Sequence, residues 1–110
     1  MKCRIYFADE QVQGAFMALK ASRDPGDQRL AGLLDQALDR ISADAFCGIQ
    51  VPKKLIPKDY HKRHGPLENL WKYNLTRSWR LMYTVASDGD TIAVIIEWLD
   101  HTDYNRRFGY

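Results

Sequence analysis

Two segments of alternating apolar and polar residues and one largely apolar segment near the carboxyl end constrain the fold of this chain most strongly. They cover residues 70–75, 79–85 and 91–98. A period of two residues predicts a strand, because successive side chains of a strand point to opposite faces of its sheet. Short polar connections join the segments, including a turn at residues 87–90. Consecutive strands with such connections predict an antiparallel β-meander.

The amino-terminal half shows one strand pattern followed by two helix patterns. Residues 2–7 alternate in polarity and predict an edge strand. Asp9 can cap a helix that continues to residue 22, and residues 23–26 break it before a second amphipathic helix at 27–43. Two helices with so short a link pack as an antiparallel hairpin. The predicted fold class is therefore α+β, with an N-terminal strand and helical hairpin packed on a C-terminal antiparallel β-meander.

The length and composition fit one domain. The chain has 110 residues, 45% of them hydrophobic, which is enough for one buried core. No apolar run approaches the ~20 residues of a membrane helix, and residues 1–4 show no apolar signal segment. We expect a cytoplasmic protein that does not interact with a membrane. Cys3 and Cys47 are expected to be free, buried thiols.

The stretch between the second helix and the meander has no clear period. Phe46 and Ile49 are expected to pack beneath the helical hairpin. Residues 51–65 contain Pro52 and Pro57, which are incompatible with a helix interior or a central strand, and predict a long structured loop. Long loops in small domains are often functional, but a lysine-bearing connector is the open alternative.

Positive charge is concentrated around this loop. Residues 50–80 carry eight lysines and arginines against two acidic residues, a net charge of +6, whereas the rest of the chain carries −4. Such segregation creates a local positive field that suits an anionic partner. A solvated basic loop is the alternative explanation.

Four side chains of the meander and its tail are candidates for chemistry. Lys72 and Arg80 lie inside two adjacent predicted strands, where a cation needs solvent or an anion, and we expect them to share one face. His101 and Tyr104 follow the last strand, and both side chains can exchange protons. Taken alone, a histidine such as His101 is more often a hydrogen-bonded structural residue. Residues 103–110 are expected to form a short helix or hook.

Three runs of the meander together resemble the strand core of the RelE/ParE toxin superfamily. Residues 69–75 give a lysine-bearing strand, residues 79–85 an aromatic residue followed by Arg-Leu-hydrophobic-Tyr, and residues 95–97 a hydrophobic strand that leads to a histidine. The preceding strand and helical hairpin follow the order of that family too. The resemblance thus covers nearly the whole chain, as a single RelE/ParE-like domain at 1–110.

The resemblance implies the toxin of a type II toxin–antitoxin pair and, in the RelE branch, an endoribonuclease that cleaves messenger RNA, often on the ribosome. It implies three partners, which are messenger RNA, the ribosome and a cognate antitoxin protein, and no metal or other cofactor. In that reaction the RNA 2′-hydroxyl attacks the adjacent phosphate. A base removes its proton, cations stabilise the phosphorane, and an acid protonates the leaving 5′-oxygen.

The resemblance also assigns site residues. Lys72 matches the strand lysine, Arg80 the phosphate-binding arginine, and His101 the position where branches carry arginine or histidine. Tyr104 matches the carboxy-terminal tyrosine, with Tyr110 as a competitor. These residues would bind the phosphate and transfer protons.

The basic loop is the part of the chain with which the family approaches nucleic acid. Contacts to phosphates there would set position and salt dependence. The predicted RNA-binding residues are Lys53, Lys54, Lys58, Lys62, Arg63, Arg77 and Tyr110. His61 and His64, even with Cys47, lack the four-ligand spacing of zinc sites, so no metal site is predicted.

Two other functions remain open. Asn74 stands where the best-known branch has a second catalytic lysine, so proton transfer would rest on His101. This departure favours a degenerate, non-toxic family member. A ParE-like protein, which inhibits DNA gyrase by contact without nuclease activity, is the other alternative, although that branch generally lacks a complete set such as Lys72, Arg80 and His101.

Overall fold

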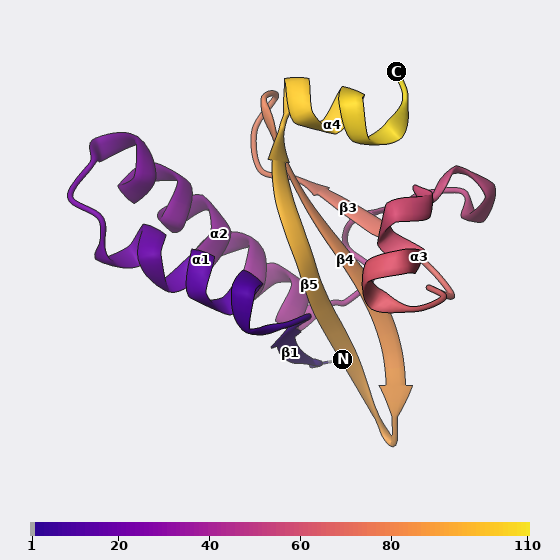
Figure 1. The fold of residues 1–110 in the computed structure, drawn as a ribbon. Helices are drawn as coiled ribbons and strands as arrows, with labels where there is room; N and C mark the ends of the chain where they lie inside the picture. The colour runs from indigo at the N-terminus through magenta and orange to yellow at the C-terminus, as the bar shows by residue number, and fades with distance from the viewer. Residues whose placement is uncertain (1) are drawn as a thin grey trace.

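A five-stranded mixed sheet separates two sets of helices in the computed structural model, which describes residues 2–110 (Figure 1). The elements in chain order are β1 (Arg4–Phe7), α1 (Glu10–Ala21), α2 (Pro25–Ala43), β2 (Ile49–Gln50), the 3₁₀ helix η1 (Lys53–Leu55), α3 (Lys58–His64), β3 (Trp71–Asn74), β4 (Trp79–Asp88), β5 (Asp90–Asp100) and α4 (His101–Phe108). The fold class is α+β, as the sequence predicted.

The sheet has the order β1-β5-β4-β3-β2. Strands β3, β4 and β5 form the predicted antiparallel meander, and β2 extends it by pairing antiparallel with β3. Strand β1 lies at the other edge, as expected, and pairs parallel with β5. A parallel neighbour requires a crossover connection, which here includes the α1–α2 hairpin.

Each helix of the hairpin begins at an aspartate. The Asp9 carboxylate accepts a hydrogen bond from the Val12 N–H at 2.9 Å, which confirms the predicted cap of α1. Asp24 caps α2 in the same way, accepting from the Asp27 N–H at 3.0 Å. Residues 25 and 26 were predicted to lie in the break, but they form the first turn of α2. Proline suits that position because the first N–H groups of a helix have no partner within it.

Two apolar clusters lie on opposite faces of the sheet. The hairpin face, which α1 and α2 cover, includes Leu81, Tyr83 and Ile95 with residues of both helices. The α3/α4 face carries the second cluster, formed by Val51, Ile56, Tyr60, Leu67, Leu70, Met82, Ile96, Leu99 and Tyr104. Helices α3 and α4 each contribute one buried tyrosine to it.

The segment expected to be a long loop is more regular than predicted. It contains η1 and α3, and each of these begins directly after a proline, Pro52 or Pro57. Proline excludes a helix interior but is tolerated at a helix start, so the prolines mark the beginnings of short helices.

The expected burial of Phe46 and Ile49 is wrong. Their exposed fractions are 57% and 52%. The turn after α2 carries the chain to the edge of the sheet, where Ile49 pairs with Lys72 and the Phe46 ring lies 5.3 Å from the Trp71 ring. The two residues therefore belong to an exposed apolar edge and not to the space beneath the hairpin.

Both cysteines are free, as predicted, but only one is buried. The Cys3 thiol donates to the Ile41 carbonyl at 3.1 Å, and burial raises its pKa. Cys47 is exposed, contrary to expectation, because it follows α2 in the turn toward the sheet edge. Across residues 2–110, no helix has the length and apolar character that crossing a membrane requires.

Candidate active site

Lys72 and Arg80 share the α3/α4 face of the sheet. Lys72 on β3 pairs with the buried Met82 of β4, which belongs to the cluster on that face. Arg80 lies two residues before Met82 and so points to the same side. Asn74, two residues after Lys72, pairs directly with Arg80. The expectation that the two cations share a face is confirmed.

Tyr104 lies against both cations. Its side chain is 6% exposed and comes from α4, which packs on this face. Lys72 Nζ donates a hydrogen bond to Tyr104 Oη at 3.3 Å and lies 5.3 Å from the centre of the ring. The Arg80 guanidinium carbon lies 5.6 Å from the same ring. Two cations and one phenol from three elements therefore meet at one place.

Backbone carbonyls orient the Arg80 guanidinium. Nη1 donates to the carbonyl oxygens of Thr76 at 3.1 Å and Arg77 at 2.9 Å, both in the β3–β4 connection. A longer contact of 3.4 Å joins it to the Trp79 carbonyl. Because these bonds use Nη1, the guanidinium can offer its other N–H groups to an anion.

His101 occupies a different environment. It is the first residue of α4 and is exposed, and its Nε2 lies 3.2 Å from the Asn105 amide nitrogen. If the amide donates, Nε2 is the acceptor and the proton of a neutral ring is on Nδ1. His101 precedes Tyr104 by three residues, about one turn of the same helix. The contacts thus join Lys72, Arg80 and Tyr104, whereas His101 contacts Asn105.

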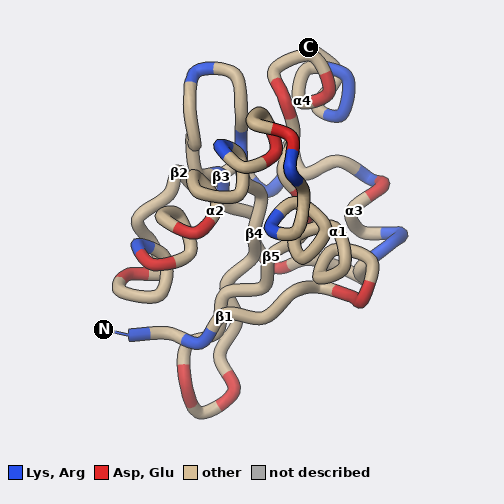
Figure 2. Tube along the Cα trace, turned by 90° about the vertical axis from the view of Figure 1, so that its left-hand side faces the viewer, with Lys and Arg blue, Asp and Glu red and all other residues tan. Residues whose placement is uncertain are grey.

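The predicted RNA-binding residues fall into two groups. Lys54, Lys58, Lys62 and Arg77 are exposed, and Figure 2 shows basic positions along α3. Lys53 pairs with Glu68 at 3.6 Å through two highly exposed side chains, so this contact competes weakly with a ligand.

Arg63 and Tyr110 make contacts within the fold. The Arg63 guanidinium donates to Gln11 Oε1 at 2.7 Å and lies 3.7 Å from the Asp9 carboxylate, which ties α3 to the start of α1. Tyr110 is 72% exposed, but its backbone N–H donates to the Asn105 carbonyl and its ring lies 6.1 Å from that of Tyr104. Tyr104, not Tyr110, is the tyrosine that contacts the cations.

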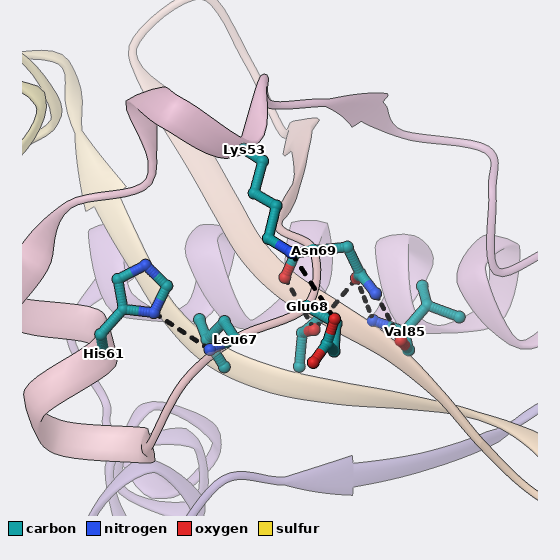
Figure 3. A network of polar contacts seen from close by, with 7 residues as sticks. Lys53, His61, Leu67, Glu68, Asn69 and Val85 are labelled. Atoms are coloured by element: carbon teal, nitrogen blue, oxygen red, sulfur yellow. Dashed lines mark hydrogen bonds and ion pairs between the residues drawn. The ribbon is translucent and has the colours of Figure 1, made fainter.

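The two histidines of the basic loop, His61 and His64, make contacts within the fold. His61 Nδ1 accepts a hydrogen bond from the Leu67 N–H at 3.0 Å, and the Asn69 amide bonds both backbone groups of Val85 (Figure 3). These bonds fasten the connection between α3 and β3. Burial and the neighbouring Arg63 lower the pKa of His64. Within residues 2–110, no three His, Cys, Asp or Glu side chains are grouped to hold a metal.

A second charged cluster on this face contains none of the predicted site residues. Glu97 of β5 contacts Arg107 of α4, and Arg107 in turn contacts Asp59 of α3. Burial and the nearby Glu97 raise the pKa of the Tyr60 hydroxyl beside them well above its ordinary value. The available signal was Glu97 itself, a charged residue between Ile96 and Trp98 in an otherwise apolar strand.

Comparison of the chain with protein-family models, curated proteins and solved structures finds no match. Evidence for the candidate site therefore comes from the contacts among its residues.

Proposed function

We propose that this chain is a RelE-like endoribonuclease, the toxin of a type II toxin–antitoxin pair, which cleaves messenger RNA without a metal. One observation carries the proposal. Lys72, Arg80 and Tyr104 come from β3, β4 and α4 and meet on one face, with Lys72 Nζ 3.3 Å from the Tyr104 hydroxyl. The resemblance of the strand residues to the RelE/ParE superfamily supports the same reading.

The arrangement matches what RNA cleavage by the 2′-hydroxyl demands. Negative charge grows on the phosphate oxygens in the transition state, and fixed cations lower its energy because they need no rearrangement. Arg80 would bind the phosphate through guanidinium N–H groups other than Nη1, and Lys72 would stabilise the charge from the neighbouring strand. The attacking group belongs to the RNA. The protein therefore has to position the RNA, stabilise the transition state and transfer protons.

Two residues could transfer those protons. Tyr104 contacts Lys72 directly, and His101 lies about one turn earlier on the same helix. A substrate phosphate bound between Arg80 and Lys72 would meet the Tyr104 hydroxyl first. His101 serves as the second proton-transfer group in the proposal, consistent with the match of its position to the family.

The positive charge of the exposed surface suggests how the proposed partners would bind. The exposed lysines of η1 and α3 would track the RNA backbone, and binding would weaken steeply with salt. An antitoxin would restrain the protein by covering its basic or apolar surface, and the ribosome would present the messenger RNA. The reaction would take place in the cytoplasm.

Induced expression in growing cells tests the proposal. The wild-type chain should stop growth and remove full-length messenger RNA, whereas the Arg80→Ala variant should do neither. Arg106→Ala is a matched control because it removes a cation from α4, where Arg106 pairs with Asp103 in solvent. It should behave as wild type.

Two other outcomes would support the alternative functions. Growth arrest with intact messenger RNA and inhibited DNA supercoiling would support the ParE-like alternative. Unimpaired growth at high expression would support the degenerate one. Either result would overturn the nuclease proposal.

A further inference from the structure

The position of Tyr104 depends on how α4 is held. Helix α4 has eight residues, and a helix this short is not stable alone in water. Its placement therefore comes from contacts with the rest of the fold. Phe108 provides an apolar one, because its ring meets the edge of the Tyr60 ring of α3 at 6.3 Å. A second anchor of the carboxyl half of the helix is ionic.

That anchor is the Glu97–Arg107 ion pair. Arg107 Nη2 donates to Glu97 Oε1 at 3.2 Å, and Arg107 Nε lies 3.2 Å from Glu97 Oε2 without forming a hydrogen bond, so one hydrogen bond and one charge contact join the two groups. The side chains are 19% and 32% exposed, which screens the pair less than a surface pair. Arg107 also lies 3.5 Å from Asp59 and stacks on the Tyr60 ring at 5.7 Å. Contacts to Glu97 of β5 and to Asp59 and Tyr60 of α3 therefore hold the Arg107 guanidinium between two elements.

A β-bulge in β5 places Glu97 on the α3/α4 face, where it meets Arg107. Met82 pairs with Glu97, but the next residue, Tyr83, pairs with Ile95, so Ile96 is an extra residue in β5. Regular alternation from Ile95, which faces the hairpin, would have pointed Glu97 at the same apolar cluster. The extra residue lets both Ile96 and Glu97 serve the α3/α4 face, where Ile96 is buried and Glu97 meets Arg107. Bulges are frequent next to active sites, where they redirect a side chain.

We propose that Glu97 and Arg107 are positioning residues, which hold Tyr104 against Lys72 and Arg80 by fixing the carboxyl half of α4. This inference rests on the proposed function. Arg107 follows Tyr104 by three residues, so the two side chains lie about one turn apart on a helix of little more than two turns. A tilt of α4 released at Arg107 therefore displaces the Tyr104 hydroxyl. Neither Glu97 nor Arg107 touches the RNA in this account.

A double-mutant cycle on RNA cleavage tests the coupling. Single-turnover cleavage of messenger RNA on programmed ribosomes is measured for wild type, Glu97→Gln, Tyr104→Phe and the double variant. Glu97→Gln should lower the rate on the order of 10²-fold, the usual consequence of a misplacement of about 1 Å. Binding of the same RNA with a 2′-deoxy sugar at the cleavage site should stay within about 2-fold of wild type. In the Tyr104→Phe background, Glu97→Gln should cost less than about 2-fold, because residues that act through one another are not additive.

Two further variants are controls for the loss of a charge on α4 and for a general loss of folding. Arg106→Gln removes a charge from the exposed neighbouring pair of the same helix and should cleave at the wild-type rate. Arg107→Lys keeps the charge but not the planar guanidinium that reaches Glu97 and Asp59 together, so it should fold and still show a reduced rate. Equal losses from Glu97→Gln in both Tyr104 backgrounds would mean that the pair only stabilises the fold, and would overturn the inference.

A readout without catalysis separates this inference from the proposed function. Amide hydrogen exchange should be faster in Glu97→Gln than in wild type at residues 104–108, with exchange in β4 unchanged. If wild type cleaves no RNA but α4 is loosened in this way, the nuclease proposal fails and the placement of Tyr104 by Glu97 stands. If exchange in α4 equals that of wild type, the ion pair does not hold the helix and the inference is wrong.

Discussion

Asn74 on β3 pairs directly with Arg80 on β4, on the face that also carries Lys72. The position at which this chain departs from the best-known RelE pattern thus lies beside the proposed phosphate-binding arginine. Its amide adds no charge to the site. A cation placed there would face the same phosphate as Arg80.

The Asn74→Lys variant should therefore cleave RNA faster than wild type, by about 10-fold, because a second fixed cation would stabilise the developing negative charge. Like charges directly across two strands oppose folding, so the free energy of unfolding should fall by about 0.2 to 1 kcal/mol. Single-turnover kinetics and urea denaturation measure the two effects. A rate at or below that of wild type in a folded variant would show that residue 74 does not face the substrate.

Alkaline pH should destabilise the protein through two buried tyrosines. Burial raises the pKa of Tyr60 and of Tyr83 above the value of about 10 for an unfolded tyrosine, and Glu97 adds to the effect on Tyr60. Below pH ~10 both tyrosines are protonated in the folded and the unfolded chain, so their contribution to the free energy of unfolding does not change with pH. Above that pH, the unfolded chain loses these protons while the folded chain keeps them, so the free energy of unfolding falls by about 1.4 kcal/mol per pH unit for each tyrosine. Denaturation between pH 9 and 12 measures the slope.

The Tyr60→Phe and Tyr83→Phe variants should each remove about one proton from that slope. Tyr83→Phe should also lower stability at neutral pH, because its hydroxyl donates to the Ala45 carbonyl at 2.8 Å and accepts from the Gly48 N–H at 3.1 Å. An unchanged alkaline slope in both variants would contradict the assignment.

Gly48 is required by close packing. A Cβ at this position would lie 2.7 Å from the Lys72 carbonyl oxygen and 2.7 Å from the Tyr83 hydroxyl. Gly48→Ala should lower the free energy of unfolding by about 1 to 3 kcal/mol. Gly32→Ala is the matched control, since Gly32 lies exposed in α2 with no atom within 4 Å of its added Cβ, and should stabilise by about 1 kcal/mol. Equal stabilities in chemical denaturation would contradict the packing argument.

Separate measurements of RNA binding and cleavage should show whether His101 transfers a proton. His101→Ala should leave RNA binding nearly intact and lower the rate roughly 10² to 10⁴-fold, the usual contribution of a positioned acid or base. Tyr104→Phe should also lower the rate. Cleavage by His101→Ala at the wild-type rate would exclude His101 as the proton-transfer group.

Much of this fold could be read from local periodicity. The alternation in β1, β3 and β4, the apolar run of β5 and the apolar stripes of the two hairpin helices mark these elements in the sequence, and the alternation along β3 and β4 placed Lys72 and Arg80 on one face. Helix α3 was missed because its seven residues show no apolar stripe and follow a proline that also fits a loop. The exposure of Phe46 and Ile49 depends on where the chain leaves α2, which no local pattern records.

The site was harder to predict than the fold, because its contacts depend on tertiary placement. Which tyrosine meets the cations is decided by how α4 docks, and the sequence offered Tyr104 and Tyr110 alike. Glu97 reaches Arg107 only because the bulge at Ile96 changes the face that it serves. A strict period of two points Glu97 into the hairpin core, so alternation alone gives the wrong side.

Analysis of the RNA ends produced by the purified protein tests the central claim most directly. Messenger RNA on programmed ribosomes is incubated with excess chelator and wild-type protein or Arg80→Ala, and the product ends are identified. The account predicts a 2′,3′-cyclic phosphate and a 5′-hydroxyl from wild type, because the attacking group is the RNA 2′-hydroxyl, and a rate lower by about 10² to 10³-fold for Arg80→Ala. Uncut RNA, 5′-phosphate ends or equal rates for the two proteins would contradict it.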